Sequence, residues 1–289
     1  MSSFPAASRK PRDDEMDVFA ISHTGKVRTE NQDHYLLATF HRRTNVLATN
    51  LADAATLLPQ EEQRLVYLAM VADGVGGGQG GREASATALE AALQYVNDAV
   101  NVYYGARDDE NEFTSMLEAA ALRAHNAVLA KRAELEVRRT MATTLTLYLG
   151  IWPTYYLLQV GDSRYYLWRG GKLTQVTRDQ TMAEDLIAQG VLTRAAAARS
   201  PMAHVLSSAI GSDSTMPVVT RLAADWHNVH LMCTDGLTKH VSEARIAEVL
   251  GSMSSAQQAC EQLLQEALDD GGSDNITIVV GRAVPKELA

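Results

Sequence analysis

Cysteine is scarce in this sequence, because only Cys233 and Cys260 occur among its 289 residues. Two cysteines cannot form the dense disulfide framework of a small secreted domain, and their spacing does not match a structural zinc site. Each lies in an apolar stretch, so we expect both to be small buried residues of the core. The sequence therefore gives no sign of a protein stabilised by disulfide bonds or by zinc.

Long apolar runs and an excess of positive charge are also missing. No apolar run approaches the roughly 20 residues of a membrane-spanning helix, and the first residues lack the apolar segment of a secretory signal. The net charge of −9 argues against a nucleic-acid-binding surface, which would carry clustered Lys and Arg. We therefore expect a cytoplasmic protein without a membrane or nucleic-acid partner.

Hydrophobic residues make up 46% of the chain, which is enough for a sizeable core. Residues 1–16 are polar, so we expect a flexible N-terminal tail followed by one domain at 17–289. Strand-like and helix-like patterns interleave in this domain without a linker, which predicts an α+β fold. The expected helices cover 82–99, 112–136, 242–250 and 255–268, and the expected strands cover 18–22, 35–40, 66–72, 141–149, 155–160, 165–168, 172–177, 229–234 and 276–280.

Two segments interrupt this pattern. Residues 41–64 are polar at both ends around a short apolar centre, and we interpret them as an insertion between two strands. Residues 178–212 lose the strand pattern and contain short helical pieces together with Gly190, Pro201 and Gly211. We interpret the second segment as a mobile flap beside a functional site.

The most informative feature is a set of aspartates at the ends of expected strands. Asp73 and Asp235 each follow an apolar run and precede a glycine, and Asp162 and Asp274 follow or precede further strands. Asp33 lies between the first two expected strands, five residues after an arginine, Arg28. Carboxylates that follow strands can converge at one rim of a sheet, so we expect these aspartates to form one site.

Five aspartates cannot be buried together without cations, although protonation could neutralise one or two of them. A ligand set of oxygen atoms without His or Cys suits Mg²⁺ or Mn²⁺ better than zinc. Two such ions can activate a bridging water that attacks phosphorus, while an arginine such as Arg28 clamps the phosphate. The residues alone therefore indicate a phosphohydrolase with two metal ions.

A nucleotide cradle is the alternative interpretation of the glycines that follow Asp73. The segment Gly74-Val75-Gly76-Gly77-Gly78 lacks the Gly-Lys-Ser/Thr ending of a phosphate-binding P-loop. The acidic residue that would bind a ribose some twenty residues further on is missing as well, because residues 91–97 have the pattern of a buried helix. Both absences disfavour nucleotide binding.

Six short motifs resemble, in order, those of the metal-dependent Ser/Thr protein phosphatases of the protein phosphatase 2C family. The resemblance covers about residues 17–282, and each motif alone is weakly specific. The motifs are Arg28-x-x-x-x-Asp33, Asp73-Gly74-x-Gly76-Gly77, Ala142-Thr143-Thr144, Gly161-Asp162-Ser163-Arg164, Thr234-Asp235-Gly236 and Asp274-Asn275.

The resemblance implies a four-layer α-β-β-α sandwich of two antiparallel sheets flanked by helices, with metal ions in a cleft at one end. It implies that Asp73 bridges two Mn²⁺ or Mg²⁺ ions, that the Gly74 carbonyl binds one of them, and that Asp235 and Asp274 bind the other. It further implies a third, weaker ion at Asp162 and Asp235. In addition, Asp33 would orient metal-bound water, Arg28 would bind the phosphate, and residues 178–212 would form the flap that faces the substrate.

The sequence departs from the family pattern at two places. Many members have His directly after the first Asp-Gly, assigned as general acid, or three residues further on, where this chain has Val75 and Gly78. The leaving alkoxide must then be protonated by another group, such as a metal-bound water near Asp162 or the flap residue His204. Gln32 stands where eukaryotic members often have Glu, which predicts weaker binding of one ion.

The expected activity is metal-dependent hydrolysis of phosphoserine and phosphothreonine in proteins by a water that bridges two ions. The resemblance also implies an opposing Ser/Thr protein kinase in a bacterium. Two alternatives stay open, a phosphatase of small phosphomonoesters and a catalytically weak module that binds phosphoproteins. At the level of single residues, Asp162 can be a turn residue and Arg28 an ordinary surface arginine.

Overall fold

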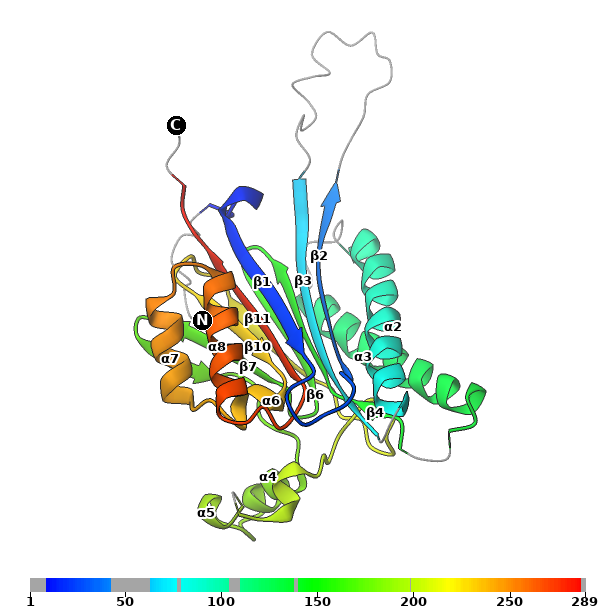
Figure 1. Cartoon of the computed structure of the whole chain (residues 1–289). Coiled ribbons are helices and arrows are strands. Elements are labelled where there is room, and N and C mark those ends of the chain that lie inside the picture. Colours follow the sequence, from blue (N-terminus) through cyan, green and yellow to red (C-terminus); the bar gives the residue numbers. More distant parts are fainter. Residues whose placement is uncertain are drawn as a thin grey trace, which may run out of the picture.

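Two antiparallel β-sheets lie face to face in the computed structural model, and a pair of helices covers the outer face of each sheet (Figure 1). The structure describes residues 9–42, 63–76, 79–103, 110–137, 140–197 and 199–286. The predicted α+β, four-layer α-β-β-α sandwich is therefore confirmed. No helix in these ranges is long and apolar enough to cross a membrane.

The first sheet joins the two ends of the chain. Its strand order is β1-β11-β10-β7-β8, so the first strand of the chain pairs with the last. Two helices, α7 and α8, pack on its outer face (Figure 1). The bounds are β1 (Met16–His23), β11 (Ile276–Ala283), β10 (Val229–Cys233), β7 (Arg164–Arg169), β8 (Lys172–Gln175), α7 (Glu243–Ser252) and α8 (Ala256–Asp269).

The second sheet carries the long helices α2 and α3 on its outer face (Figure 1). Its strand order is β2-β3-β5-β6-β9, and a short strand, β4, pairs with the end of β3. The bounds are β2 (Asp33–Arg42), β3 (Gln63–Val75), β4 (Ala142–Thr143), β5 (Leu145–Ile151), β6 (Thr154–Val160), β9 (Val218–Ala223), α2 (Gln79–Tyr103) and α3 (Glu110–Glu134).

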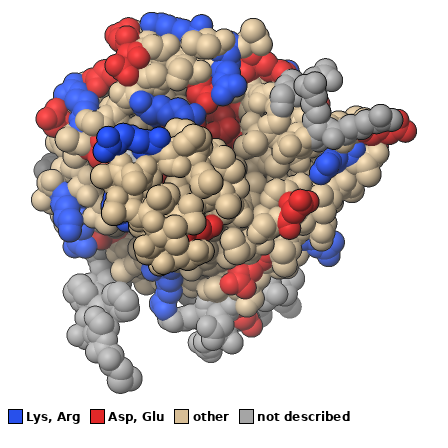
Figure 2. All heavy atoms as spheres, turned by 90° about the horizontal axis from the view of Figure 1, so that it is seen from below, with Lys and Arg blue, Asp and Glu red and all other residues tan. Residues whose placement is uncertain are grey.

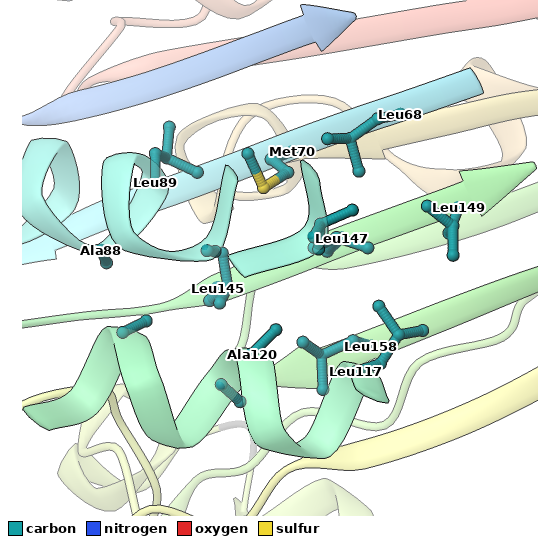
Figure 3. Packing of buried hydrophobic residues seen from close by; sticks show 14 of the residues in the cluster. Leu68, Met70, Ala88, Leu89, Leu117, Ala120, Leu145, Leu147, Leu149 and Leu158 are labelled. Atoms are coloured by element: carbon teal, nitrogen blue, oxygen red, sulfur yellow. The ribbon is translucent and has the colours of Figure 1, made fainter. Parts of the chain in front are cut away.

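The hydrophobic core is divided into three layers by the two sheets. Leucines of β3, β5 and β6 point toward small residues of α2 and α3, including Ala88 and Ala120 (Figure 3). A second layer lies between the first sheet and α7 and α8, and it contains Cys233 and Cys260, both buried and unpaired as predicted. The third layer, between the sheets, is smaller and includes Val71, Tyr165 and Met232.

Leu147→Ala tests how much the core layer between the second sheet and helices α2 and α3 contributes to stability. Leu147 is fully buried in β5, so truncation leaves a cavity between close-packed neighbours. We expect the free energy of unfolding to fall by about 2–5 kcal/mol, measured by urea denaturation. Leu122→Ala is the control, because Leu122 on α3 is 49% exposed and its truncation should change the free energy by less than about 1 kcal/mol.

Two elements differ from the sequence-based expectation. The sequence does not predict strand β9, because it is a half-exposed strand next to β6 at the edge of the sheet and lacks a continuous apolar pattern. The four-residue helix α6 (Asp235–Thr238) was also missed, since four residues give no helical period. Asp235 is consequently the first residue of a helix and does not end a strand.

The N-terminal segment is attached to the domain from residue 9 onward. Arg9 pairs with Glu15, Trp226 donates to the Arg9 carbonyl at 2.8 Å, and Arg64 donates to the Pro11 carbonyl at 2.7 Å. Part of the predicted tail thus packs on the domain, while residues 1–8 lie outside the described residues. Of the predicted insertion at 41–64, the ends belong to β2 and β3, and residues 43–62 lie outside the described residues.

Candidate metal centre

The two sheets bring four strand ends together at one end of the sandwich, the lower end in Figure 1. Strand β2 begins there with Asp33, which lies directly opposite Asp73 in the antiparallel pair β2–β3. The loop before β11 and the helix after β10 reach the same end and carry Asp274 and Asp235. Like charges directly opposite on neighbouring strands destabilise a sheet, so this arrangement requires protons or cations.

Asp33 is held in the interior by two hydroxyl groups. Its side chain is only 5% exposed, and its Oδ2 accepts hydrogen bonds from Thr234 at 2.9 Å and Thr277 at 2.8 Å. Its Oδ1 is buried and has no hydrogen-bond partner among the described residues. Burial raises the pKa of Asp33 to about 7, the two hydroxyls oppose this, and the nearby Asp235 and Asp274 raise it further.

Asp73 lies at the centre of the cluster that the five predicted aspartates form. Its backbone is fixed, because its N–H donates to the Thr144 hydroxyl at 2.9 Å and its carbonyl accepts from the Thr143 hydroxyl at 2.8 Å. Burial raises the pKa of Asp73 well above its ordinary value, and four more carboxylates add to the effect. In order of decreasing effect these are Asp33, Asp235, Asp162 and Asp274. All five predicted aspartates therefore lie close enough to interact electrostatically.

Gly74 permits an unusually close approach of three backbone segments. A Cβ atom at this position would lie 2.2 Å from the Gly81 carbonyl oxygen and 2.7 Å from the Gln32 carbonyl oxygen. The Gly74 N–H donates to Gln32 at 3.2 Å. Only glycine fits between the start of α2 and the loop that carries Asp33. Gly77 and Gly78 lie outside the described residues, whereas Val75 is 37% exposed.

Asp235 and Asp274 share a lysine that sequence reasoning missed. Lys239 Nζ lies 2.7 Å from Asp235 Oδ2 and 2.7 Å from Asp274 Oδ2. The other oxygen of Asp235, Oδ1, is buried and has no hydrogen-bond partner in the part of the chain that the structure describes. Asp274 also accepts two hydrogen bonds from Arg28, at 2.7 and 3.0 Å. Burial acts to raise the pKa of Asp274, but Arg28 and Lys239 outweigh burial and hold it below its ordinary value.

Asp162 occupies the turn between β6 and β7 on the Asp235 side of the group. Burial raises its pKa to about 7, and Asp235 and then Asp179 raise it further, while Lys239 lowers it. The turn is connected to the predicted flap, because the Gly161 N–H donates to the Gln180 side chain at 2.8 Å. Asp162 is a turn residue, and it also lies close enough to Asp235 for their charges to interact.

The flap segment is joined at both ends to residues that neighbour the aspartates. It contains α4 (Met182–Ala188), α5 (Arg194–Ala197) and the 3₁₀ turn η2 (Pro201–His204), and α4 and α5 lie away from the sheets in Figure 1. Its far end returns at Ile210, which exchanges two backbone hydrogen bonds of 2.9 Å with Thr143. Thr143 in turn binds the Asp73 carbonyl. Displacement of either end of the flap, at Gln180 or at Ile210, would therefore disturb a candidate metal ligand, Asp162 or Asp73.

The remaining predicted site residues differ in how they are placed. Arg28 belongs to the group, because it forms the bidentate contact with Asp274, although 56% of its side chain is exposed. His204 is exposed in η2, and no contact among the described residues connects it to the carboxylates. The structure therefore brings Arg28 to the site and does not bring His204 to it.

Two further residues position the loops of the site. Asn275 accepts a hydrogen bond from the Gln32 N–H at 2.9 Å and donates to the carbonyls of Thr24 and Glu30. His240 accepts from the Ser273 N–H at 2.9 Å and thereby fixes the loop that leads to Asp274. Asn275 belongs to the motif Asp274-Asn275, but its role as a link between loops could not be read from the sequence. His240 gave no sequence signal.

The oxygen atoms of these residues suit hard divalent metal ions such as Mg²⁺ and Mn²⁺. Every candidate ligand is an oxygen atom, and two carboxylate oxygens, Asp33 Oδ1 and Asp235 Oδ1, are buried with no hydrogen-bond partner in the described ranges. Among the described residues, no group of three or more His, Cys, Asp or Glu side chains is placed to hold a metal ion. Lys239 and Arg28 contact Asp235 and Asp274, and these contacts would have to be released before a metal ion could bind there. Figure 2 shows this end of the molecule, where acidic atoms lie in a hollow beside Lys and Arg atoms.

The raised pKa values predict an unusual pH dependence of the metal-free protein. The folded state binds protons at Asp33 and Asp162 up to about pH 7, whereas the unfolded chain releases them near pH 3.8. The folded state thus binds more protons in this window, and the free energy of unfolding falls as pH rises from about 4 to about 7. We expect a loss of several kcal/mol in EDTA, measured by urea denaturation.

Saturating Mn²⁺ should remove this loss, because metal binding requires the deprotonated carboxylates. Asp33→Asn should also flatten the pH dependence in EDTA. A stability in EDTA that rises steadily from pH 4 to pH 7 would contradict the placement of buried carboxyl groups at this end.

Comparisons with known proteins agree with this geometry. The family model described as "Protein phosphatase 2C" matches residues 39–270. The chain is similar to the serine/threonine protein phosphatase PstP of Mycobacterium tuberculosis, with 34% identity over 218 residues, which are 75% of this chain and 40% of PstP. It is also similar to the protein phosphatase PhpP of Streptococcus pneumoniae, with 26% identity over 270 residues, which are 92% of this chain and 96% of PhpP.

A solved structure has the same fold. The catalytic domain of PstP in complex with two manganese ions aligns with a TM-score of 0.70 and 28% identity over 93% of this chain and 99% of that chain. The chain thus spans less than half of the full-length PstP sequence but nearly all of the catalytic domain in that structure. The order of its motifs, the sandwich and the matched family model together show that this chain belongs to the protein phosphatase 2C family.

Proposed function

We propose that this chain hydrolyses phosphoserine and phosphothreonine in proteins, in a reaction that depends on two divalent metal ions. The observation that carries the proposal is the convergence of Asp33, Asp73, Asp162, Asp235 and Asp274 at one end of the sandwich, with Arg28 beside them. The relatives add support, because PstP is named a serine/threonine protein phosphatase and its catalytic domain has been solved with two manganese ions.

Asp73 is the proposed ligand shared by both ions, since it lies at the centre of the carboxylate group and its backbone is fixed on both sides. The Gly74 carbonyl would help to hold one ion, and Asp235 and Asp274 would hold the other. Asp162 and Asp235 would hold a third ion. The oxygen-only donor set suits both Mn²⁺ and Mg²⁺, and we propose Mn²⁺ because the related PstP domain contains manganese.

The ions, when bound, activate water for attack on phosphorus and neutralise charge that develops on the phosphoryl oxygens. Asp33 is suited to orient the attacking water, because its unpartnered Oδ1 can accept a hydrogen bond while Thr234 and Thr277 fix its Oδ2. Arg28 is suited to bind the phosphate. It uses two of the five guanidinium N–H groups on Asp274, which leaves others for phosphate oxygens.

Protein substrates are favoured over small phosphomonoesters by the flap surface. Met182, Val191, Met202 and Val205 are between 41% and 64% exposed in this segment. Exposed apolar side chains close to a charged site suit the side chains that flank a phosphorylated residue in a peptide. We propose on this basis that the substrates are phosphoproteins and that a Ser/Thr protein kinase catalyses the opposing reaction.

The test compares two substrates at equal Mn²⁺ concentration, a phosphothreonine peptide and p-nitrophenyl phosphate. We expect kcat/KM to be higher for the peptide, since the flap can contribute only to peptide binding. Preference for p-nitrophenyl phosphate would favour the small-molecule phosphatase. Peptide binding without turnover in either Mn²⁺ or Mg²⁺ would favour the non-catalytic module.

Val75 stands where many family members have His, so another group must protonate the leaving alkoxide. The proposed donor is a water near Asp162 or the side chain of His204, and the exposed position of His204 in η2 favours the water. The variant His204→Ala tests the second candidate. His204→Ala should then alter the rate of phosphothreonine peptide hydrolysis on the acidic side of the pH profile, while p-nitrophenyl phosphate, which has a better leaving group, should be less affected. Unchanged pH profiles for both substrates would exclude His204, in line with its lack of contact with the carboxylates.

A further inference from the structure

Lys239 connects two carboxylates that come from distant parts of the chain. Its Nζ lies 2.7 Å from both Asp235 and Asp274, and Asp274 is 35 residues away in the sequence. The lysine ends helix α6, where its backbone N–H donates to the Asp235 carbonyl at 2.9 Å. The helix therefore presents the ammonium group to the same two residues that are proposed to bind one metal ion.

This arrangement differs from an ordinary surface ion pair. Isolated exposed pairs contribute little, but the side chains of Asp235 and Asp274 are only 22% and 18% exposed, and one ammonium group serves both. Arg28 also contacts Asp274, but its contacts in the described part of the chain do not include Asp235. Lys239 is thus the cation that holds these two carboxylates together.

We propose that Lys239 is an internal cation that competes with the divalent metal ion for Asp235 and Asp274 and so lowers the metal affinity of this position. The inference rests on the proposed function, which assigns these two aspartates to one ion. A lysine ammonium is a compact point charge that donates hydrogen bonds but cannot act as a metal ligand. Metal and ammonium therefore make opposing demands on the same carboxylate oxygens.

The lysine can leave the carboxylates without a change of the backbone. Its side chain is 28% exposed and has a flexible stem of four carbons, so rotation can move the ammonium into solvent. Without metal the lysine neutralises part of the negative charge of the clustered aspartates and stabilises the fold. With metal this contribution is lost, and the loss appears as a weaker apparent affinity.

Titration of EDTA-stripped protein with Mn²⁺ in a calorimeter tests the proposal. Lys239→Gln removes the charge and keeps a polar side chain that is one atom shorter, so we expect one Mn²⁺ site to bind about tenfold more tightly, which corresponds to about 1.4 kcal/mol. The metal-free variant should unfold at a lower temperature than the wild type, and saturating Mn²⁺ should reduce the difference. Lys239→Arg keeps the charge and should stay close to the wild type.

Lys131→Gln is the matched control, because Lys131 pairs with Glu134 on α3 at 3.0 Å and does not contact the carboxylate group. Its Mn²⁺ affinity should equal that of the wild type. If Lys239→Gln does not fold without metal, the dependence of its unfolding temperature on Mn²⁺ concentration reports the same affinity.

The possible results separate this inference from the proposed function. Equal or weaker Mn²⁺ binding by Lys239→Gln, with binding by the wild type intact, would overturn the inference alone. Tighter binding by Lys239→Gln without turnover of any phosphopeptide would support the inference and count against the proposed activity. A wild-type protein that binds no Mn²⁺ would overturn both.

Discussion

Asp73→Asn is expected to lower Mn²⁺-dependent release of phosphate from a phosphothreonine peptide by at least about hundredfold, because loss of a group that only supports a ligand already costs 10–100-fold. Asparagine has nearly the same shape, so the substitution removes the charge and leaves the backbone bonds to Thr143 and Thr144 in place. The measurement is the initial rate of phosphate release at saturating Mn²⁺.

A stability measurement distinguishes loss of a ligand from loss of the fold. The Asp73 carboxyl is destabilised by burial and by four neighbouring carboxylates, so its removal should not lower the unfolding temperature in EDTA. Asp98→Asn is the control, because Asp98 is exposed on α2, and its rate should equal that of the wild type. Activity of Asp73→Asn within about threefold of the wild type would contradict the proposed role of Asp73 as a shared ligand.

Gly74→Ala is expected to lower the free energy of unfolding by about 3 kcal/mol or more and to abolish activity. The added Cβ would lie 2.2 Å from the Gly81 carbonyl oxygen and 2.7 Å from that of Gln32. Both are backbone atoms, so relief of the clash must move the start of α2 or the loop before Asp33. The measurement is urea denaturation combined with the peptide assay.

Gly251→Ala is the control for the same substitution at another glycine. Gly251 is exposed in α7, and the nearest atom to its added Cβ belongs to the Trp168 side chain at 3.2 Å. Because alanine favours helix more than glycine does, this variant should differ from the wild type by less than about 1 kcal/mol. A Gly74→Ala variant as stable as Gly251→Ala would contradict the close packing around Gly74.

The sequence predicted the elements that have a clear period or a long apolar run. Strand β3 and helices α2, α3, α7 and α8 belong to this class, and they carry most of the core. The edge strand β9 and the four-residue helix α6 lack such a signal, because their conformation depends on tertiary contacts. The four-layer order came from the family resemblance, since strand pairing over such distances is not encoded in local patterns.

The same holds for the candidate site, where the sequence predicted the aspartates but not the residues that contact them. The strand-end pattern predicted that Asp73, Asp235 and Asp274 converge, because the ends of β3, β10 and β11 meet at one rim. It did not predict the hydroxyls of Thr234 and Thr277 around Asp33. Nor did it predict that Arg28 contacts Asp274, since that contact links residues 246 apart in the sequence.

Lys239 illustrates why such partners escape sequence reasoning. Its pairing with Asp235 follows the i,i+4 rule of helices, but α6 is too short to be recognised. Its contact with Asp274 exists only after the loop held by His240 has folded against α6. The positions of the acids and of Arg28 could thus be read from the chain, whereas Lys239 and the contacts of both cations with the acids could not.

The most direct test of the metal centre is anomalous X-ray diffraction at the manganese absorption edge from crystals grown with Mn²⁺. Two strong peaks are predicted, both in contact with Asp73, one of them also with Asp235 and Asp274 and the other with the Gly74 carbonyl. A third, weaker peak at Asp162 and Asp235 would fit the proposed third ion. Absence of the two strong peaks at this end of the sandwich, or strong peaks bound by other residues, would contradict the account.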